Sequence, residues 1–174
     1  GTTVRAILTA NPNQDPNRLQ VGQYLNLPYG FPVVPVDVPF TSELVQVCIQ
    51  GLMVRYPFLS RRTIAATAYR RPVSALCMGA GPRAVLYNAS HHANEWITTP
   101  VLLKFLEEYA HAVSVNGRIF GLDAQTLFQK TRLYLVPMVN PDGVDLVTGA
   151  IPPDSAQYAA AQRIAARYPE IPFP

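Results

Sequence analysis

The sequence predicts an α/β fold, a sheet flanked by helices, and three stretches carry this prediction. Residues 85–87 (Val-Leu-Tyr) are apolar, with a β-branched and an aromatic member, so they indicate a short buried strand. Residues 100–112 place apolar side chains at helical spacing with charged ones opposite, which predicts an amphipathic helix. Residues 133–139 are too apolar for an edge strand, so we expect them at the centre of the sheet.

The first 40 residues are rich in turn formers. Residues 2–10 predict a short helix, which Asn11-Pro12 ends. Residues 19–28 predict a brief strand closed by Pro28. Residues 30–40 alternate proline with β-branched residues, as in an extended connector of limited flexibility, and a domain boundary is expected after them.

Periodicity and turn residues predict the elements of the remaining chain. Thr41 or Ser42 can cap a helix that runs to Tyr56, with Glu43 in its first turn favourable to the helix dipole. Asn116-Gly117 is expected to form a turn or helix end. The further predictions are strands at 61–69, 73–78 and 84–89, a helix at 123–130, and a helix or surface excursion at 154–168.

Composition excludes several classes of protein. With 174 residues, 49% of them hydrophobic, the chain can build a real core, and no apolar run is long enough to cross a membrane. The net charge of +3 comes from scattered Lys and Arg residues, which is not the pattern of a nucleic-acid-binding protein. Cys48 and Cys77 are expected to be buried thiols rather than a disulfide.

The stretch from Asn88 to Trp96 holds the candidate site, because it lies between a predicted strand and a predicted helix. His92 and Glu95 are three residues apart, a spacing that turns both side chains to one side at the start of a helix. Imidazole and carboxylate are common zinc ligands, and a catalytic zinc needs about three, so a third must come from elsewhere. The alternative is a helix N-terminus with an acidic residue in its first turn.

Two motifs resemble those of the zinc metallocarboxypeptidase family: His-Ala-Asn-Glu-Trp at 92–96, and an apolar strand ending in Asn-Pro-Asp-Gly at 140–143. The resemblance implies a partial carboxypeptidase-like mixed sheet flanked by helices, with Zn²⁺ bound by His92 and Glu95. Asn-Pro-Asp-Gly is then structural, a turn at the end of a strand. Trp96 is expected to pack at the helix start.

The family pattern also requires a second His ligand, substrate-reading Arg residues, a Tyr and a general-base Glu, all expected downstream of Pro174. We therefore predict no catalytic base within this chain and no activity for this stretch alone. His111 lies about five helical turns from His92, too far to share a metal, and is expected to be a surface histidine. His91 is expected to point away from the metal, as a hydrogen-bonded neighbour.

The hairpin at 61–78 departs from the family pattern Gly-x-Ser-x-x-Gly-Arg-Pro. Ala65, Thr67 and Arg70 stand where Gly, Ser and Gly are usual, while Arg71-Pro72 is retained. The second glycine of the pattern suits a turn with positive φ, so Arg70 is expected to cost about 1 kcal/mol or more.

Residues 1–28 resemble the second, αβ half of a LysM module, a small unit that binds N-acetylglucosamine-containing glycans. A functionless proline-rich leader is the alternative. The predicted organisation is a partial LysM module at 1–28, a linker at 29–40 and the N-terminal part of a zinc carboxypeptidase-like domain at 41–174. The chain is expected to be a piece of a longer protein, cut at both ends.

Together these resemblances imply an enzyme similar to bacterial γ-D-glutamyl-L-diamino acid endopeptidases, which cut the stem peptide of peptidoglycan. Asn94 stands where digestive carboxypeptidases commonly have Arg, so it is expected to read substrate by hydrogen bonds. The expected partners are the stem peptide and glycan, at the bacterial cell wall or, alternatively, in the cytoplasm of a spore-forming cell. Two alternative hypotheses are that the chain is a non-catalytic or degenerate wall-binding relative, or an ordinary α/β domain with coincidental motifs. A sheet without its later strands is expected to self-associate.

Overall fold

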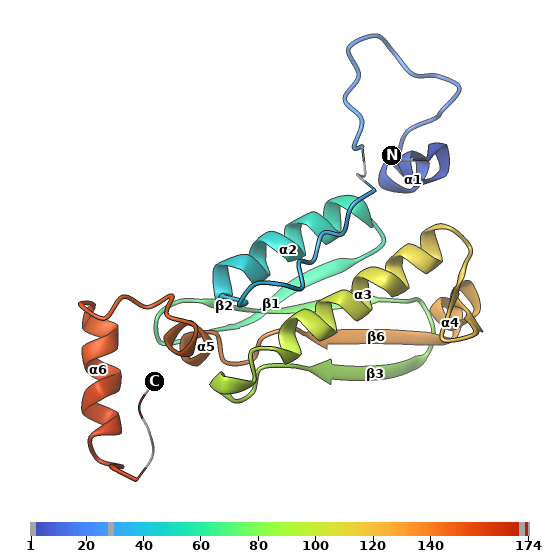
Figure 1. Cartoon of the computed structure of the whole chain (residues 1–174). Coiled ribbons are helices and arrows are strands. Elements are labelled where there is room, and N and C mark those ends of the chain that lie inside the picture. The colour runs from blue at the N-terminus through green and yellow to red at the C-terminus, as the bar shows by residue number, and fades with distance from the viewer. Residues whose placement is uncertain (1–2, 28–29, 171–172, 174) are drawn as a thin grey trace.

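The computed structural model describes residues 3–27, 30–170 and 173, and its centre is a mixed four-stranded sheet (Figure 1). The strand order is β1-β2-β6-β3, where β1 is Ser60–Ala66, β2 is Pro72–Met78, β6 is Thr131–Val136 and β3 is Arg83–Asn88. The pairs β1/β2 and β2/β6 are antiparallel, and β3/β6 is parallel. This arrangement confirms the α/β prediction and the central place of the 133–139 stretch, although the strand ends at Val136.

Two long helices, α2 (Ser42–Arg55) and α3 (Thr98–Ser114), lie on one face of the sheet (Figure 1). The core fills the space between them, because the buried face of each element is apolar. The largest fully buried side chains include Phe40, Ile49 and Leu52 from the α2 side, Leu103 and Leu106 from α3, and Leu76, Met78 and Leu135 from the sheet. These contacts give the sheet a packed face on the side of the helices.

Local sequence explains where the helices begin. Thr41 caps α2, since its hydroxyl accepts from the amide of Leu44 at 3.2 Å. Asp123 caps α4 (Ala124–Lys130) in the same way at 2.7 Å, and hydrogen bonds from the side chain and then the amide of Thr126 lower the pKa of its carboxyl. Smaller elements complete the chain: η1 (Ala93–Glu95), the two-residue strands β4 (Arg118–Ile119) and β5 (Leu122–Asp123), α5 (Pro141–Val147) and α6 (Ala156–Ala165).

Two strand predictions are wrong in part. Residues 85–87 do lie in a strand, but β3 is an edge strand with β6 as its single neighbour, so Leu86 is 63% and Tyr87 49% exposed instead of buried. Within 19–27 no strand is formed, and Val21 and Tyr24 are exposed. Side-chain hydrogen bonds explain this, because Gln23 binds the amide of Gln20 and holds a turn there. Pro28 lies outside the described residues.

The N-terminal segment is tied to the rest by polar contacts. Helix α1 (Val4–Ala10) confirms the first predicted helix over its described part, and its Arg5 donates to the carbonyl of Ser114 at 2.7 Å. Asn11 and Asn26 close the loop between them: the Asn11 side chain donates to the carbonyl of Asn26 and accepts from its amide, both at 2.8 Å. Further along, Val34 and Phe40 are buried in the core, so the proline-rich connector is packed onto the domain.

None of the helices in the described ranges combines the length and hydrophobicity that crossing a membrane requires. Cys48 and Cys77 are free thiols, the first buried and the second half-buried.

Candidate metal centre

Strand β3 delivers the candidate site to the edge of the sheet, and buried hydrogen bonds fix the loop that follows it. Ser90 adopts a left-handed φ of 49°, and its amide donates to the hydroxyl of Thr98 at 2.8 Å. The hydroxyls of Ser90 and Thr99 are 2.6 Å apart, and Thr99 also donates to the carbonyl of Pro137 at 2.6 Å. Because Thr98 and Thr99 belong to α3 and Pro137 follows β6, two other parts of the fold hold the loop.

The structure brings His92 and Glu95 together. His92 precedes η1 in an extended conformation, and the amide of Glu95 donates to its carbonyl at 3.2 Å. This tight turn sets the imidazole Nδ1 3.1 Å from Oε2 of Glu95. Their side chains are 75% and 51% exposed, so both groups are open to a ligand from solvent. The predicted pairing on one side of the turn is therefore confirmed as geometry.

The pair fits a zinc ion. With Zn–N and Zn–O bonds of about 2.1 Å, a tetrahedral angle separates two ligand atoms by about 3.4 Å. The observed separation of 3.1 Å differs by a few tenths of an ångström, which a small side-chain rotation supplies. If Nδ1 of His92 and Oε2 of Glu95 held a metal, the imidazole proton would lie on Nε2.

No third ligand accompanies the pair in the described ranges: they contain no group of three or more His, Cys, Asp or Glu side chains placed to hold a metal. His91 is exposed and makes no hydrogen bond with the pair. His111 is exposed near the far end of α3, as expected of a surface histidine. Asn94 lies in η1 with its side chain exposed beside Glu95.

The Asn-Pro-Asp-Gly motif begins a helix instead of forming only a turn. Asn140 caps α5 through a 3.0 Å bond from the amide of Gly143, and Pro141 occupies the first turn. Gly143 lies against η1: a Cβ on it would be 2.9 Å from Cβ of Ala93 and 2.6 Å from Nδ2 of Asn140. The second motif therefore supports the residue between the two candidate ligands, a structural role as predicted.

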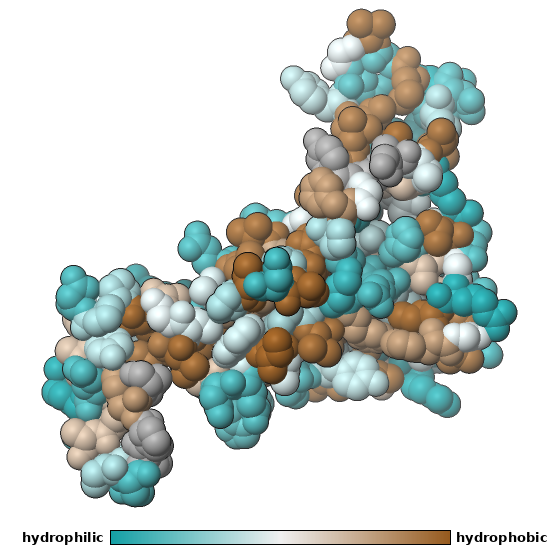
Figure 2. All heavy atoms as spheres, viewed as in Figure 1, coloured by the Kyte–Doolittle hydropathy of each residue, from teal (hydrophilic) through white to brown (hydrophobic). Residues whose placement is uncertain are grey.

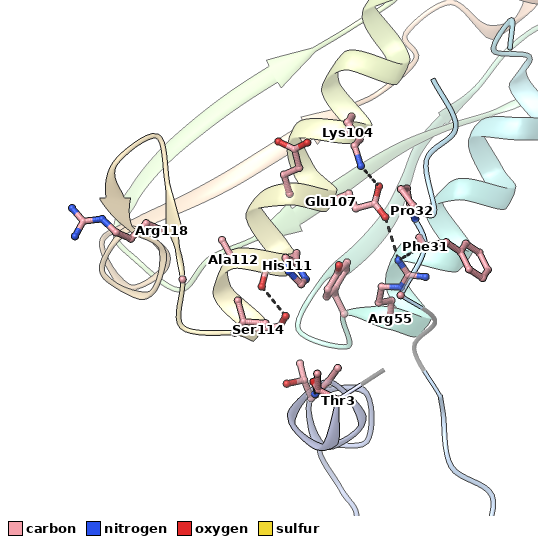
Figure 3. Close-up of a pocket in the computed structure, with 17 residues that line it drawn as sticks. Thr3, Phe31, Pro32, Arg55, Lys104, Glu107, His111, Ala112, Ser114 and Arg118 are labelled. Carbon is pink, nitrogen blue, oxygen red and sulfur yellow. Dashed lines mark hydrogen bonds and ion pairs between the residues drawn. The ribbon is translucent and has the colours of Figure 1, made fainter. Parts of the chain in front are cut away.

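A cavity of about 420 Å³ lies elsewhere, between α1, the connector and the C-terminal half of α3 (Figure 3). Figure 3 shows His111 at this cavity, and shows Glu107 bonded to Lys104 and Arg55. These charges compensate one another inside the cavity wall. The cavity lies toward the C-terminal end of α3, whereas η1 precedes its N-terminal end, so the cavity is separate from the candidate metal centre.

Sequence reasoning missed the residues that hold the site loop from outside. Thr98 and Thr99 give no recognisable motif, because their role depends on the approach of Ser90 and Pro137. The family pattern includes Arg71 but does not reveal that its guanidinium binds two carboxylates of α5. The Asp142/Asp145 spacing on one helical face was the available signal for such a partner.

Comparison with known proteins decides the family. The family model described as "Zinc carboxypeptidase" matches residues 45–164, which is more than half of the chain. The chain belongs to the zinc carboxypeptidase family. Within that zinc carboxypeptidase segment lie both motifs and all four strands of the main sheet.

Two curated relatives are similar to this zinc carboxypeptidase chain. Gamma-D-glutamyl-L-diamino acid endopeptidase 1 of Lysinibacillus sphaericus is 43% identical over 108 residues, covering 62% of the chain and 27% of the relative. Uncharacterized protein YqgT of Bacillus subtilis (strain 168) is 44% identical over 110 residues, covering 62% and 29%. The chain thus spans less than a third of the length of the curated relatives it matches.

Solved structures support the fold. The carboxypeptidase A from Helicoverpa armigera has a TM-score of 0.53 to this chain at 21% sequence identity, covering 66% of the chain and 28% of that structure. This likeness confirms the predicted carboxypeptidase-like mixed sheet flanked by helices.

Proposed function

We propose that this chain contributes His92 and Glu95 as two zinc ligands of a peptidase that hydrolyses the γ-D-glutamyl-diamino acid bond of peptidoglycan stem peptides. The observation that carries the proposal is the 3.1 Å approach of Nδ1 of His92 to Oε2 of Glu95 on a loop bonded to α3 and, through Thr99, to the segment after β6. The bond specificity rests on the name of the Lysinibacillus relative.

Bound zinc supplies a water of lowered pKa and polarises the scissile carbonyl. The residues of this chain hold and orient that ion. His92 and Glu95 would bind it with their exposed side chains, while the Ser90–Thr99–Pro137 bonds hold the loop to α3 and to the segment after β6. Since the described residues supply two ligands, hydrolysis requires a third ligand and a general base from outside them, and the 174-residue chain alone is expected to be inactive.

The substrate side of the proposal centres on Asn94. Its amide is exposed on η1 next to Glu95, where it can donate to and accept from a peptide without adding charge. We further propose that residues 1–28 bind glycan as part of a LysM module, which would raise the effective concentration of stem peptide at the site. The proposed place of action is the bacterial cell wall.

Zinc titration of the 174-residue chain tests the metal proposal. We expect one weak site, and we expect both His92→Ala and Glu95→Gln to weaken it at least about tenfold, since a direct ligand matters no less than the groups around it. His91→Ala and His111→Ala are the controls, because both histidines are exposed and lie outside the pair. Equal losses in all four variants would refute the assignment.

A peptide titration followed by NMR tests the substrate class. The probe is a stem tripeptide with a γ-linked D-glutamate before its diamino acid, added with zinc. We expect shifts of the Asn94 side-chain amide resonances, and smaller shifts with an α-linked L-glutamyl peptide. Identical responses to the two peptides would refute the γ-D-glutamyl specificity while leaving the metal site intact.

A further inference from the structure

Arg71 joins three separate parts of the fold. It follows the β1–β2 turn, and its Nε lies 2.5 Å from Oδ2 of Asp145 while its Nη1 lies 2.9 Å from Oδ1 of Asp142. Both aspartates belong to α5. Asp145 also accepts from the amide and hydroxyl of Ser42 at 2.7 and 2.6 Å, which adds the start of α2.

The ion pairs are largely withdrawn from solvent. The side chain of Arg71 is 22% exposed, that of Asp142 20% and that of Asp145 5%. Thr67 adds a 2.8 Å bond from its hydroxyl to Asp142, so the turn contacts α5 through two side chains. A planar guanidinium can bind two carboxylates at fixed angles, which an ammonium group cannot do.

Helix α5, which Arg71 binds, contacts the loop that carries the candidate metal ligands. Gly143 follows Asp142 and lies against Ala93, the residue after His92. The segment before α5 is also bonded to the site loop, because Asn140 donates through its backbone to the carbonyl of Ser90 at 3.0 Å. A shift of α5 would therefore disturb η1, and with it the tight turn that sets the His92–Glu95 separation.

We infer that Arg71 is a positioning residue for the zinc ligands: by fixing α5 through Asp142 and Asp145, it holds His92 and Glu95 at metal-binding distance. The inference rests on the proposed metal site, but its structural half concerns the chain without metal. Arg71 does not touch the pair, so its effect is transmitted through Gly143 and Ala93.

Amide hydrogen exchange of the full chain without zinc tests the structural half. Arg71→Gln should speed exchange at Glu95 and Gly143 about tenfold, the change expected when a charge-assisted hydrogen bond is lost. The amide of Leu103, buried in α3, should change much less. Acceleration of Leu103 by the same factor would mean general destabilisation and would overturn the inference.

Zinc titration of the same variants tests the functional half. Arg71→Gln should weaken zinc binding about tenfold, as outer groups of metal sites do, and Arg71→Lys should restore part of it. Arg70→Gln is the matched control, since it removes a charge from the same turn and leaves the Arg71 ion pairs with Asp142 and Asp145 in place. Unchanged exchange and unchanged zinc affinity in Arg71→Gln would overturn the inference.

Two further measurements keep the test decisive. If Arg71→Gln does not fold, Asp142→Asn replaces it, because it breaks one ion pair and leaves the one to Asp145. The same local acceleration is expected, and its absence overturns the inference. If the unmodified chain shows no zinc binding that depends on His92, the proposed function fails, and metal-free exchange still decides whether Arg71 holds η1.

Discussion

Arg70 shows how a single departure from a family pattern is recorded in the backbone. Its φ of 61° lies in the left-handed region that glycine adopts freely, as the sequence predicted for this turn. We expect Arg70→Gly to raise the free energy of unfolding by about 0.5–1 kcal/mol. Glycine relieves the backbone strain at this φ, but its greater entropy in the unfolded chain offsets part of the gain. Urea denaturation measures the change. Arg70→Ala retains a Cβ and should give no gain, so equal stabilisation by alanine would contradict this account.

Cys48 is expected to make the free energy of unfolding fall as the pH rises above 9. Burial, and then the negative charge of Glu107, raise the pKa of its thiol from 9.0 to about 11. The unfolded thiol therefore ionises first, and stability should fall between pH 9 and pH 11 by up to about 2 kcal/mol from this group. Denaturation across this range should show a smaller fall in Cys48→Ala than in the unmodified chain. Cys77→Ala should behave like the unmodified chain, and an unchanged pH profile in Cys48→Ala would refute the assignment.

At the residue scale, sequence reasoning predicted that His92 and Glu95 lie side by side, because three-residue spacing and a following turn determine where two side chains point. It did not locate Thr99 or Arg71. Their partners are 38 and 74 residues away along the chain, and such contacts follow from the packing of whole elements rather than from local pattern.

At the scale of elements, Glu107 connects α3 to the connector and to α2. Its carboxylate accepts from the amide of Val33 at 2.5 Å and pairs with Arg55 at 3.3 Å and with Lys104 at 3.1 Å. The Glu107 side chain is 5% exposed and that of Arg55 13%. The connector is therefore held to α3 by a buried charge.

We expect Glu107→Gln to lower the free energy of unfolding by about 3 kcal/mol, because it leaves the positive charge of Arg55 buried without its partner. Residues 30–38 should also become sensitive to limited proteolysis, which maps the release of the connector. Glu108→Gln is the control, since Glu108 is adjacent and exposed. Equal effects of the two substitutions would show that Glu107 does not anchor the connector.

Helices were the elements best predicted from sequence, because caps and spacing are local; Thr41 and Asp123 begin α2 and α4 as expected. Strand burial was less predictable. Residues 85–87 have the composition of a buried strand. Their exposure depends on whether another strand pairs on each side, and β3 pairs only with β6 in the described sheet.

For the whole molecule, the sheet has unequal faces. Tyr87 packs against Phe105 of α3 in a T-shaped contact, so its neighbour Leu86 points to the opposite face, where it is 63% exposed. Figure 2 also shows hydrophobic residues at the surface over the middle of the molecule, where α2 and α3 lie in Figure 1. An exposed edge strand and apolar surface of this kind favour association.

We expect the 174-residue chain to self-associate at rising concentration, and Leu86→Lys to reduce this, because a lysine on an edge strand opposes pairing with another chain. Analytical ultracentrifugation measures the effect. Val4→Lys is the control, since Val4 is 75% exposed on α1, away from the sheet. Association that Leu86→Lys leaves unchanged would show that the β3 edge is not the contact surface.

The burial of Val34 and Phe40 has a practical consequence for protein engineering. A chimaera that exchanges the segment before the connector for another module must be joined upstream of Val33, so that it keeps the whole connector that packs against α2. A chain starting at Thr41 would lack the buried side chains of Val34 and Phe40 and the Val33 amide that donates to Glu107.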